Sequence, residues 1–136
     1  MSLIRFGVSM EDELVDLLDS LVEREGYANR SEAIRSLVRK ELVRSVSEDD
    51  DQEIAGIITL IYRYGHRSKE APAGKYPTLR ITANLQVHLH DDICQKVITV
   101  QGSARDVTSW ARDVMSQKGV IGSLTVAATQ DMYPSI

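Results

Sequence analysis

Hydrophobic and polar residues alternate from Leu3 to Met10, and this period of two predicts a short, half-buried strand. The apolar face carries Ile4, Phe6, Val8 and Met10, and the polar face carries Arg5, Gly7 and Ser9. A strand this short cannot satisfy its own backbone groups or cover its apolar face. We therefore expect two chains to pair these strands as an antiparallel ribbon.

Helical periodicity replaces the alternation after residue 10. Leucines at helical spacing predict a first helix that opens with a capping box at Ser9 and Asp12 and stops at Gly26. Asn29 followed by Glu32 marks the start of a second helix with its own apolar stripe. Residues 1–45 thus read as strand, helix, helix.

The polar, acidic stretch 46–52 has no apolar period and is interpreted as a linker to a second domain, residues 53–136. Four strands are expected there, at 54–64, 78–90, 94–100 and 120–129. Asp91-Asp92 forms a turn, 65–77 holds at most a broken helix, and a helix capped by Ser103 and Asp106 runs to Gly119. The order βαββαβ is ferredoxin-like, so the fold class is α+β.

Composition narrows the range of functions. The chain has 136 residues, a net charge of −4 and one cysteine, so it offers no global positive field and no intrachain disulfide. A lone thiol suits a reducing cytoplasm, and we expect neither a signal peptide nor a membrane span. The chain has only one Phe, one Trp and five Tyr, too few to predict an aromatic surface on which single-stranded bases could stack.

The polar face of the predicted ribbon has the chemistry to read a DNA major groove. A two-stranded ribbon fits that groove, Arg5 can bind guanine in a bidentate pair, and Ser9 can hydrogen-bond to several bases. Gly7 carries no reading group and permits close approach. The start of the second helix, at Asn29, Arg30 and Ser31, presents backbone N–H groups and a positive dipole end to a phosphate.

Several motifs along the chain resemble the NikR family of nickel-responsive ribbon-helix-helix regulators. They are Asp19-Ser20-Leu21, Gly26-Tyr27, the run Asn29 to Arg35, the strand end Tyr62 to His66, the hairpin 85–94, Asp106-Val107, and Lys118-Gly119-Val120. The resemblance implies an ACT-like effector domain, a homotetramer made of two ribbon dimers, and double-stranded operator DNA as the partner. It also implies a square-planar nickel site of three His and one Cys at the subunit interface.

The family's nickel ligands are only half retained. Ungapped alignment places His88 and Cys94 at two ligand positions, but it places Gln86 at a third and Lys75, expected from a neighbouring subunit, at the fourth. A neutral amide oxygen is a poor substitute for imidazole toward Ni²⁺. High-affinity nickel binding is therefore expected to be impaired or lost.

Other interpretations of these residues stay open. A shifted alignment makes His88, His90 and Cys94 a residual site, and His66 is a candidate secondary ligand. Alternatively, Cys94 is a small buried hydrophobic residue and His88 is an interface or surface residue. Without nickel, the Lys75 ammonium could replace the metal's charge, or a small molecule could serve as the effector.

Three classes of function are compatible with these features. The first is a DNA-binding transcriptional regulator, expected to be a repressor. The second is an antitoxin-like interaction protein, although the β-rich pattern after residue 53 argues against it. The third is an enzyme using Cys94 and His88, but no orienting group or oxyanion element accompanies them, so we expect no catalytic activity.

Overall fold

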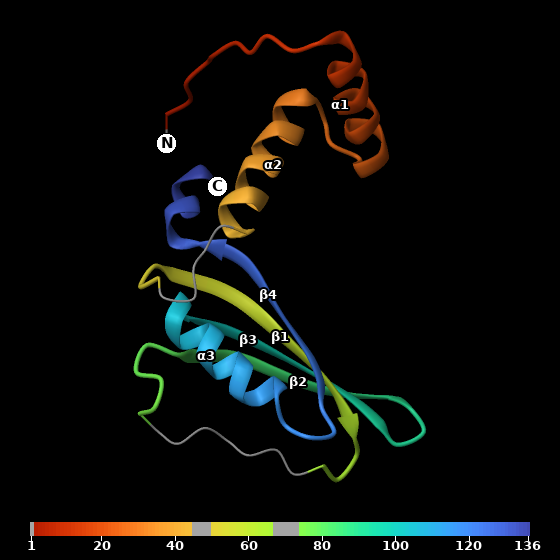
Figure 1. Cartoon of the computed structure of the whole chain (residues 1–136), viewed down its shortest axis with the longest axis vertical. Helices are drawn as coiled ribbons and strands as arrows, with labels where there is room; N and C mark the ends of the chain where they lie inside the picture. Colours follow the sequence, from red (N-terminus) through yellow and green to blue (C-terminus); the bar gives the residue numbers. More distant parts are fainter. Residues whose placement is uncertain (1, 45–49, 67–73) are drawn as a thin grey trace.

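The computed structural model describes residues 2–44, 50–66 and 74–136. Two helices, α1 (Asp12–Glu25) and α2 (Arg30–Arg44), precede a sheet domain with the elements β1 (Glu53–Arg63), β2 (Arg80–His90), β3 (Ile93–Ser103), α3 (Ala104–Met115), β4 (Ile121–Thr129) and the 3-10 helix η1 (Gln130–Ser135). The two helices lie at one end of the molecule, beyond the edge of the sheet where β4 meets η1 (Figure 1). The chain is thus α+β, as the sequence predicts.

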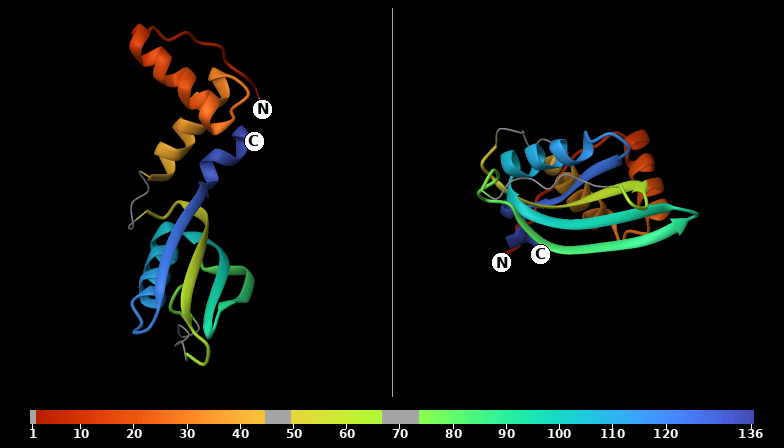
Figure 2. Two further views of the ribbon diagram at one scale, coloured as in Figure 1. Left: turned by 90° about the vertical axis from the view of Figure 1, so that its right-hand side faces the viewer. Right: turned by 90° about the horizontal axis from the view of Figure 1, so that it is seen from below.

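All strand pairs in the four-stranded sheet are antiparallel, in the order β2-β3-β1-β4. This is the strand order of a ferredoxin-like domain. Helix α3 lies along one face of the sheet (Figure 2). Its Val107 and Trp110 form one buried cluster with Ile54, Ile58 and Val100 of the strands. The expected helix between the first two strands falls mostly on residues 67–73, outside the described part of the chain.

The opposite face of the sheet is apolar and largely open. Leu85, Val87 and Ile121 point to this side in the strand register and are 61%, 38% and 74% exposed. An exposed apolar face of this kind is typical of an interaction surface. The expected homotetramer therefore has an available surface.

The segment from Leu3 to Met10 is not a strand in the single chain, and its pairing with a second chain stays a prediction. Residues 2–11 run as an irregular segment above the two helices, because a strand needs a hydrogen-bonded neighbour and the described residues supply none there. The predicted capping box at Ser9 is wrong. Helix α1 has Glu11 at its N-cap, without a side-chain cap hydrogen bond.

Other helix boundaries follow local chemistry. Gly26 ends α1 in the left-handed conformation, with φ of 74°. The Asn29 side chain accepts a hydrogen bond from the backbone N–H of Glu32 at 2.9 Å, and Ser103 caps α3 in the same way through Asp106 at 3.2 Å. The expected end of α3 at Gly119 is wrong, because the helix stops at Met115 and Gly119 lies in the following loop.

Two features join the parts of the chain. Of the predicted linker, 46–49 lies outside the described residues, whereas Asp50 and Gln52 accept backbone hydrogen bonds from Arg105 and Ala104 at the start of α3. These contacts satisfy helix N–H groups that would otherwise be unpaired. At the other end, Arg39 of α2 donates two hydrogen bonds to Ser135 of η1, at 3.2 and 2.9 Å.

Candidate DNA interface and candidate metal centre

The N-terminal unit leaves its apolar residues uncovered. Among residues 2–44 only Ala33 is buried, whereas Phe6, Val8 and Leu17 are 79%, 63% and 66% exposed. The N-terminal segment and the two helices border an open apolar groove of about 690 Å³. Amphipathic helices of this kind are stable only when their apolar stripe is covered. In a single chain the apolar stripes of this unit are therefore left uncovered.

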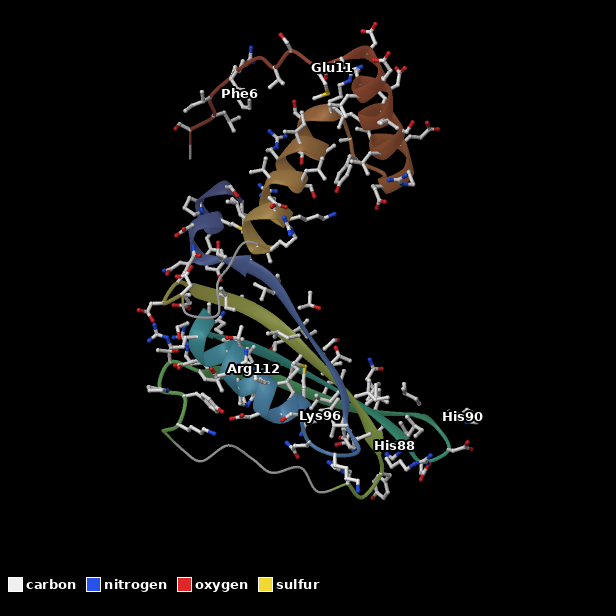
Figure 3. The ribbon with its side chains drawn as sticks, viewed as in Figure 1. Phe6, Glu11, His88, His90, Lys96 and Arg112 are labelled. Atoms are coloured by element: carbon white, nitrogen blue, oxygen red, sulfur yellow. The ribbon has the colours of Figure 1, made fainter. Side chains whose placement is uncertain are left out.

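The three candidate base-reading residues lie on this exposed segment. Arg5, Gly7 and Ser9 are all exposed, and a Cβ atom added to Gly7 would meet nothing within 4 Å. Figure 3 shows the segment around Phe6 running clear of the sheet domain. The Arg5 side chain is thus accessible to a binding partner.

The candidate phosphate contacts at the start of α2 are already partly engaged. Arg30 donates two hydrogen bonds to Asp19, at 2.7 and 2.9 Å, so the guanidinium is held between the two helices. This arginine lowers the pKa of the Asp19 carboxyl, first through the hydrogen bond. Asn29 serves as the helix cap, and Ser31 is exposed. The helix start retains its positive dipole end.

The hairpin of β2 and β3 brings together two of the four positions that the resemblance marks as ligands. His88 is the cross-strand partner of Cys94, and its Nδ1 atom lies 3.8 Å from the Cys94 Sγ atom. Cys94 is fully buried, whereas His88 is exposed with its ring centroid 5.3 Å from that of Tyr64. The two donors lie on the face of the sheet that α3 partly covers.

At Gln86, the third of these four positions, both the side chain and the charge beside it differ from those of an imidazole ligand. Gln86 is the cross-strand partner of Lys96, so an amide and an ammonium lie side by side at the position where the resemblance implies an imidazole ligand. Figure 3 shows Lys96 and His88 on neighbouring parts of this hairpin. A cation next to a cation site opposes metal binding. Sequence reasoning did not single out Lys96, although its alternation with Cys94 along β3 places it on the same face.

Lys75 and His90 do not join this cluster. Lys75 forms an ion pair with Asp113 of α3 at 2.8 Å, and its ammonium lies 5.4 Å from the Tyr76 ring centroid. His90 is at the hairpin tip, with its side chain 85% exposed and paired with Asp91 at 3.5 Å (Figure 3). A bulge separates His90 from His88 in the ladder. Lys75 is thus held within its own chain.

Donor chemistry decides how well this region fits nickel. No three His, Cys, Asp or Glu side chains in the described ranges converge to hold a metal ion. One imidazole and one thiol, beside an amide and an ammonium, do not make the planar set of nitrogen and sulfur donors that Ni²⁺ favours. The residues present therefore do not fit the family's nickel site.

Comparison with known proteins assigns both halves of the chain. Residues 4–45 match the family model described as ribbon-helix-helix protein, copG family, and residues 55–126 match the NikR C terminal nickel binding domain. Two proteins named as nickel-responsive regulators, from Thermococcus onnurineus and Pelobacter propionicus, are 38% and 36% identical in sequence to this chain. The alignments cover 95% and 93% of this chain, and 96% and 94% of those proteins. In the described ranges no helix has the length and apolar character needed to cross a bilayer.

Proposed function

Because the chain belongs to the NikR family of nickel-responsive ribbon-helix-helix regulators, we propose that it is a transcriptional repressor with impaired or lost high-affinity nickel binding. It binds double-stranded operator DNA in the cytoplasm and has no catalytic activity. The unfilled core of the N-terminal unit supports this proposal most strongly. That unit needs a second copy, and the paired copies would present two Arg5 side chains to one major groove.

The open face of the sheet supports a larger assembly. Two ribbon dimers joined through four sheet domains would form a homotetramer that contacts two operator half-sites. The sheet domains would then set the distance between the ribbons, and an effector bound there could favour one arrangement only by binding that arrangement more tightly.

Selection of DNA from a random-sequence pool tests the DNA-binding part of the proposal. Wild-type protein is expected to enrich a palindromic sequence, because a two-fold symmetric ribbon reads two-fold symmetric DNA. An Arg5→Ala protein should enrich no sequence while keeping its oligomeric state. Co-purification with a small basic protein, without enrichment of DNA, would instead support the antitoxin-like alternative.

A nickel titration tests the metal part. Thiolate-to-metal charge-transfer absorbance is followed in tag-free protein, with Cys94→Ala as the control. We expect no saturable band at one metal per chain, because two of the four donors are replaced. A strong band that disappears in the control would mean that His88, His90 and Cys94, or these residues with a partner's ligand, form a working site.

A further inference from the structure

A cavity of about 390 Å³ opens on the α3 face of the sheet, beside the His88–Cys94 pair. Its floor is the ends of β1, β2 and β3, and its roof is the last turn of α3 with the loop that follows. Its size falls in the range of sites that bind small molecules. The cavity includes Gln86, so it occupies the place next to the replaced metal ligand.

One end of this cavity carries hydrogen-bond donors and a positive charge. Lys96 and Gln86 are cross-strand partners and both line it. No carboxylate lies within ion-pair distance of the Lys96 ammonium among the described residues, and no aspartate or glutamate is part of the lining. An ammonium without a counter-ion at the end of a cavity attracts an anion.

His66 also lines this cavity. Among the described residues, its buried Nε2 atom has no hydrogen-bond partner. The ring lies beside Gly119, where an added Cβ would be 3.5 Å from Nδ1, and its centroid is 6.0 Å from that of Tyr62. A buried polar atom without a partner is rare and costs free energy unless a ligand or water pairs with it. The fold therefore keeps a donor or acceptor ready at this point.

The other end of the cavity is apolar. Leu60, Val114 and Val120 line it, and all three belong to or pack against the buried core. Tyr62 lines the wall between the two ends. Its hydroxyl can donate a hydrogen bond.

We propose that this cavity binds a small aliphatic carboxylate, with the carboxylate at Lys96, Gln86 and His66 and the hydrocarbon part against Leu60, Val114 and Val120. The bound molecule is the signal to which the regulator responds in place of nickel. The signalling part of the inference rests on the proposed function, whereas the binding part does not.

The residues that line the cavity favour an aliphatic carboxylate over a metal cation and over inorganic phosphate. A metal cation would meet the Lys96 ammonium and no carboxylate ligand, which is unfavourable on charge. Inorganic phosphate would match the charge but would leave the apolar end filled with water, so that end would add no affinity. An aliphatic carboxylate satisfies both ends at once.

The test compares each acid with its own amide in the full-length protein. Propionate, isovalerate and hexanoate are titrated by calorimetry, alongside propionamide, isovaleramide, hexanamide and inorganic phosphate. At least one acid should bind saturably and about tenfold more tightly than its amide, since a hydrogen-bonded charge contributes more than a neutral pair. Phosphate should not compete with that acid.

Two matched variants identify the site. Lys96→Met keeps the length of the side chain and should weaken acid binding by about tenfold. Lys40→Met, which removes a lysine from α2, should leave it unchanged. If no acid binds better than its amide, or if Lys96→Met binds as tightly as wild type, the carboxylate site is wrong.

The signalling part is read separately, from the affinity for the selected DNA with and without the best acid. We expect the acid to change that affinity by about fivefold or more, the usual lower range of allosteric coupling. Acid binding with unchanged DNA affinity would remove the signalling role and leave the site. Acid binding by a protein that selects no DNA would instead contradict the proposed regulator function and leave the site intact.

Discussion

The two halves of this chain differ in how much of their core one copy can build. The sheet domain buries a continuous cluster around Ile58, Val107 and Trp110 between α3 and the strands. The N-terminal unit buries only Ala33 in residues 2–44. One copy therefore builds the core on the α3 side of the sheet domain, but it leaves the apolar stripes of the helical unit uncovered. In the proposed assembly, the stability of the helical unit would depend more strongly on a second chain than the stability of the α3-side core.

The comparison predicts that core truncation acts most strongly in the sheet domain. Trp110 is 4% exposed and packs in the centre of the buried cluster. Trp110→Ala should lower the free energy of unfolding by about 3–5 kcal/mol, the usual cost of removing a buried aromatic side chain. Urea unfolding, followed by far-ultraviolet circular dichroism, measures this. Leu17→Ala in α1 is the control, and an equal loss at low protein concentration would contradict the asymmetry.

Stability should depend on protein concentration more strongly in the N-terminal half than in the α3-side core of the sheet domain. A helical unit whose core is completed by a second copy melts at a temperature that rises with protein concentration. Phe6→Ala should lower that temperature, because the residue lies on the face that the partner is expected to cover. Amide hydrogen exchange at two concentrations separates the halves. Equal hydrogen-exchange protection of the α1 amides at both protein concentrations would mean that one copy is enough to stabilise the helix.

Removal of Arg5 should affect DNA binding without affecting the fold. Arg5→Ala is expected to cost about 1–3 kcal/mol of binding free energy, the usual contribution of a bidentate arginine–guanine contact. Fluorescence anisotropy on selected DNA gives the dissociation constants. Arg24→Ala removes another exposed arginine, at the far end of α1, and should bind normally. Similar losses in both variants would indicate general charge rather than base reading.

Introducing an imidazole at position 86 should raise the nickel affinity of the sheet domain. Gln86→His places a nitrogen donor beside His88 and Cys94 and should tighten nickel binding at least about tenfold, because even outer-shell partners of a metal change affinity by that much. Adding Lys96→Met should tighten it further by removing the neighbouring charge. Nickel titration with a competing chelator reports both. Unchanged affinity in the double variant would show that the lost partner-subunit ligand dominates.

The smallest expected effect concerns acid stability of the sheet domain. Hydrogen bonds from the Thr78 hydroxyl and backbone N–H lower the pKa of the Asp106 carboxyl below its ordinary value. A lowered folded-state pKa adds stability that is fully present above the ordinary value and is lost as pH falls through the lowered one. Asp106→Asn should therefore melt earlier than wild type at pH 7. The difference in melting temperature between variant and wild type should shrink below about pH 4. A difference that persists at that pH would exclude the Asp106 carboxylate charge as its cause.

Local chemistry explains which sequence predictions are confirmed. Several ends of helices and strands are set by backbone conformation or by one hydrogen bond to a near neighbour in sequence. They lie at Gly26, Asn29, Ser103 and the Asp91-Asp92 turn. The alternation in β1 likewise matches its burial pattern. Such features are visible within a few residues of sequence, so both helices of the N-terminal unit and all four strands of the sheet were predictable.

Long-range contacts explain the rest. The strand at Leu3 to Met10 needs a second chain, and η1 lies against α2 through Arg39, which is 96 residues away from Ser135 in sequence. Lys75 aligns with a metal ligand but pairs with Asp113, 38 residues further on. The cavity with His66, Gln86 and Lys96 forms only when β1, β2, β3 and α3 come together. Periodicity and spacing carry no signal for these contacts.

The most direct test of the account is the affinity of the wild-type protein for its selected DNA, measured by anisotropy with saturating Ni²⁺ and with a chelator. The account predicts tight, Arg5-dependent binding that nickel changes by less than about twofold, because an effector that does not bind a site cannot shift its equilibrium. Binding that requires nickel, and that Cys94→Ala abolishes, would contradict it and show that the chain still builds a working nickel site.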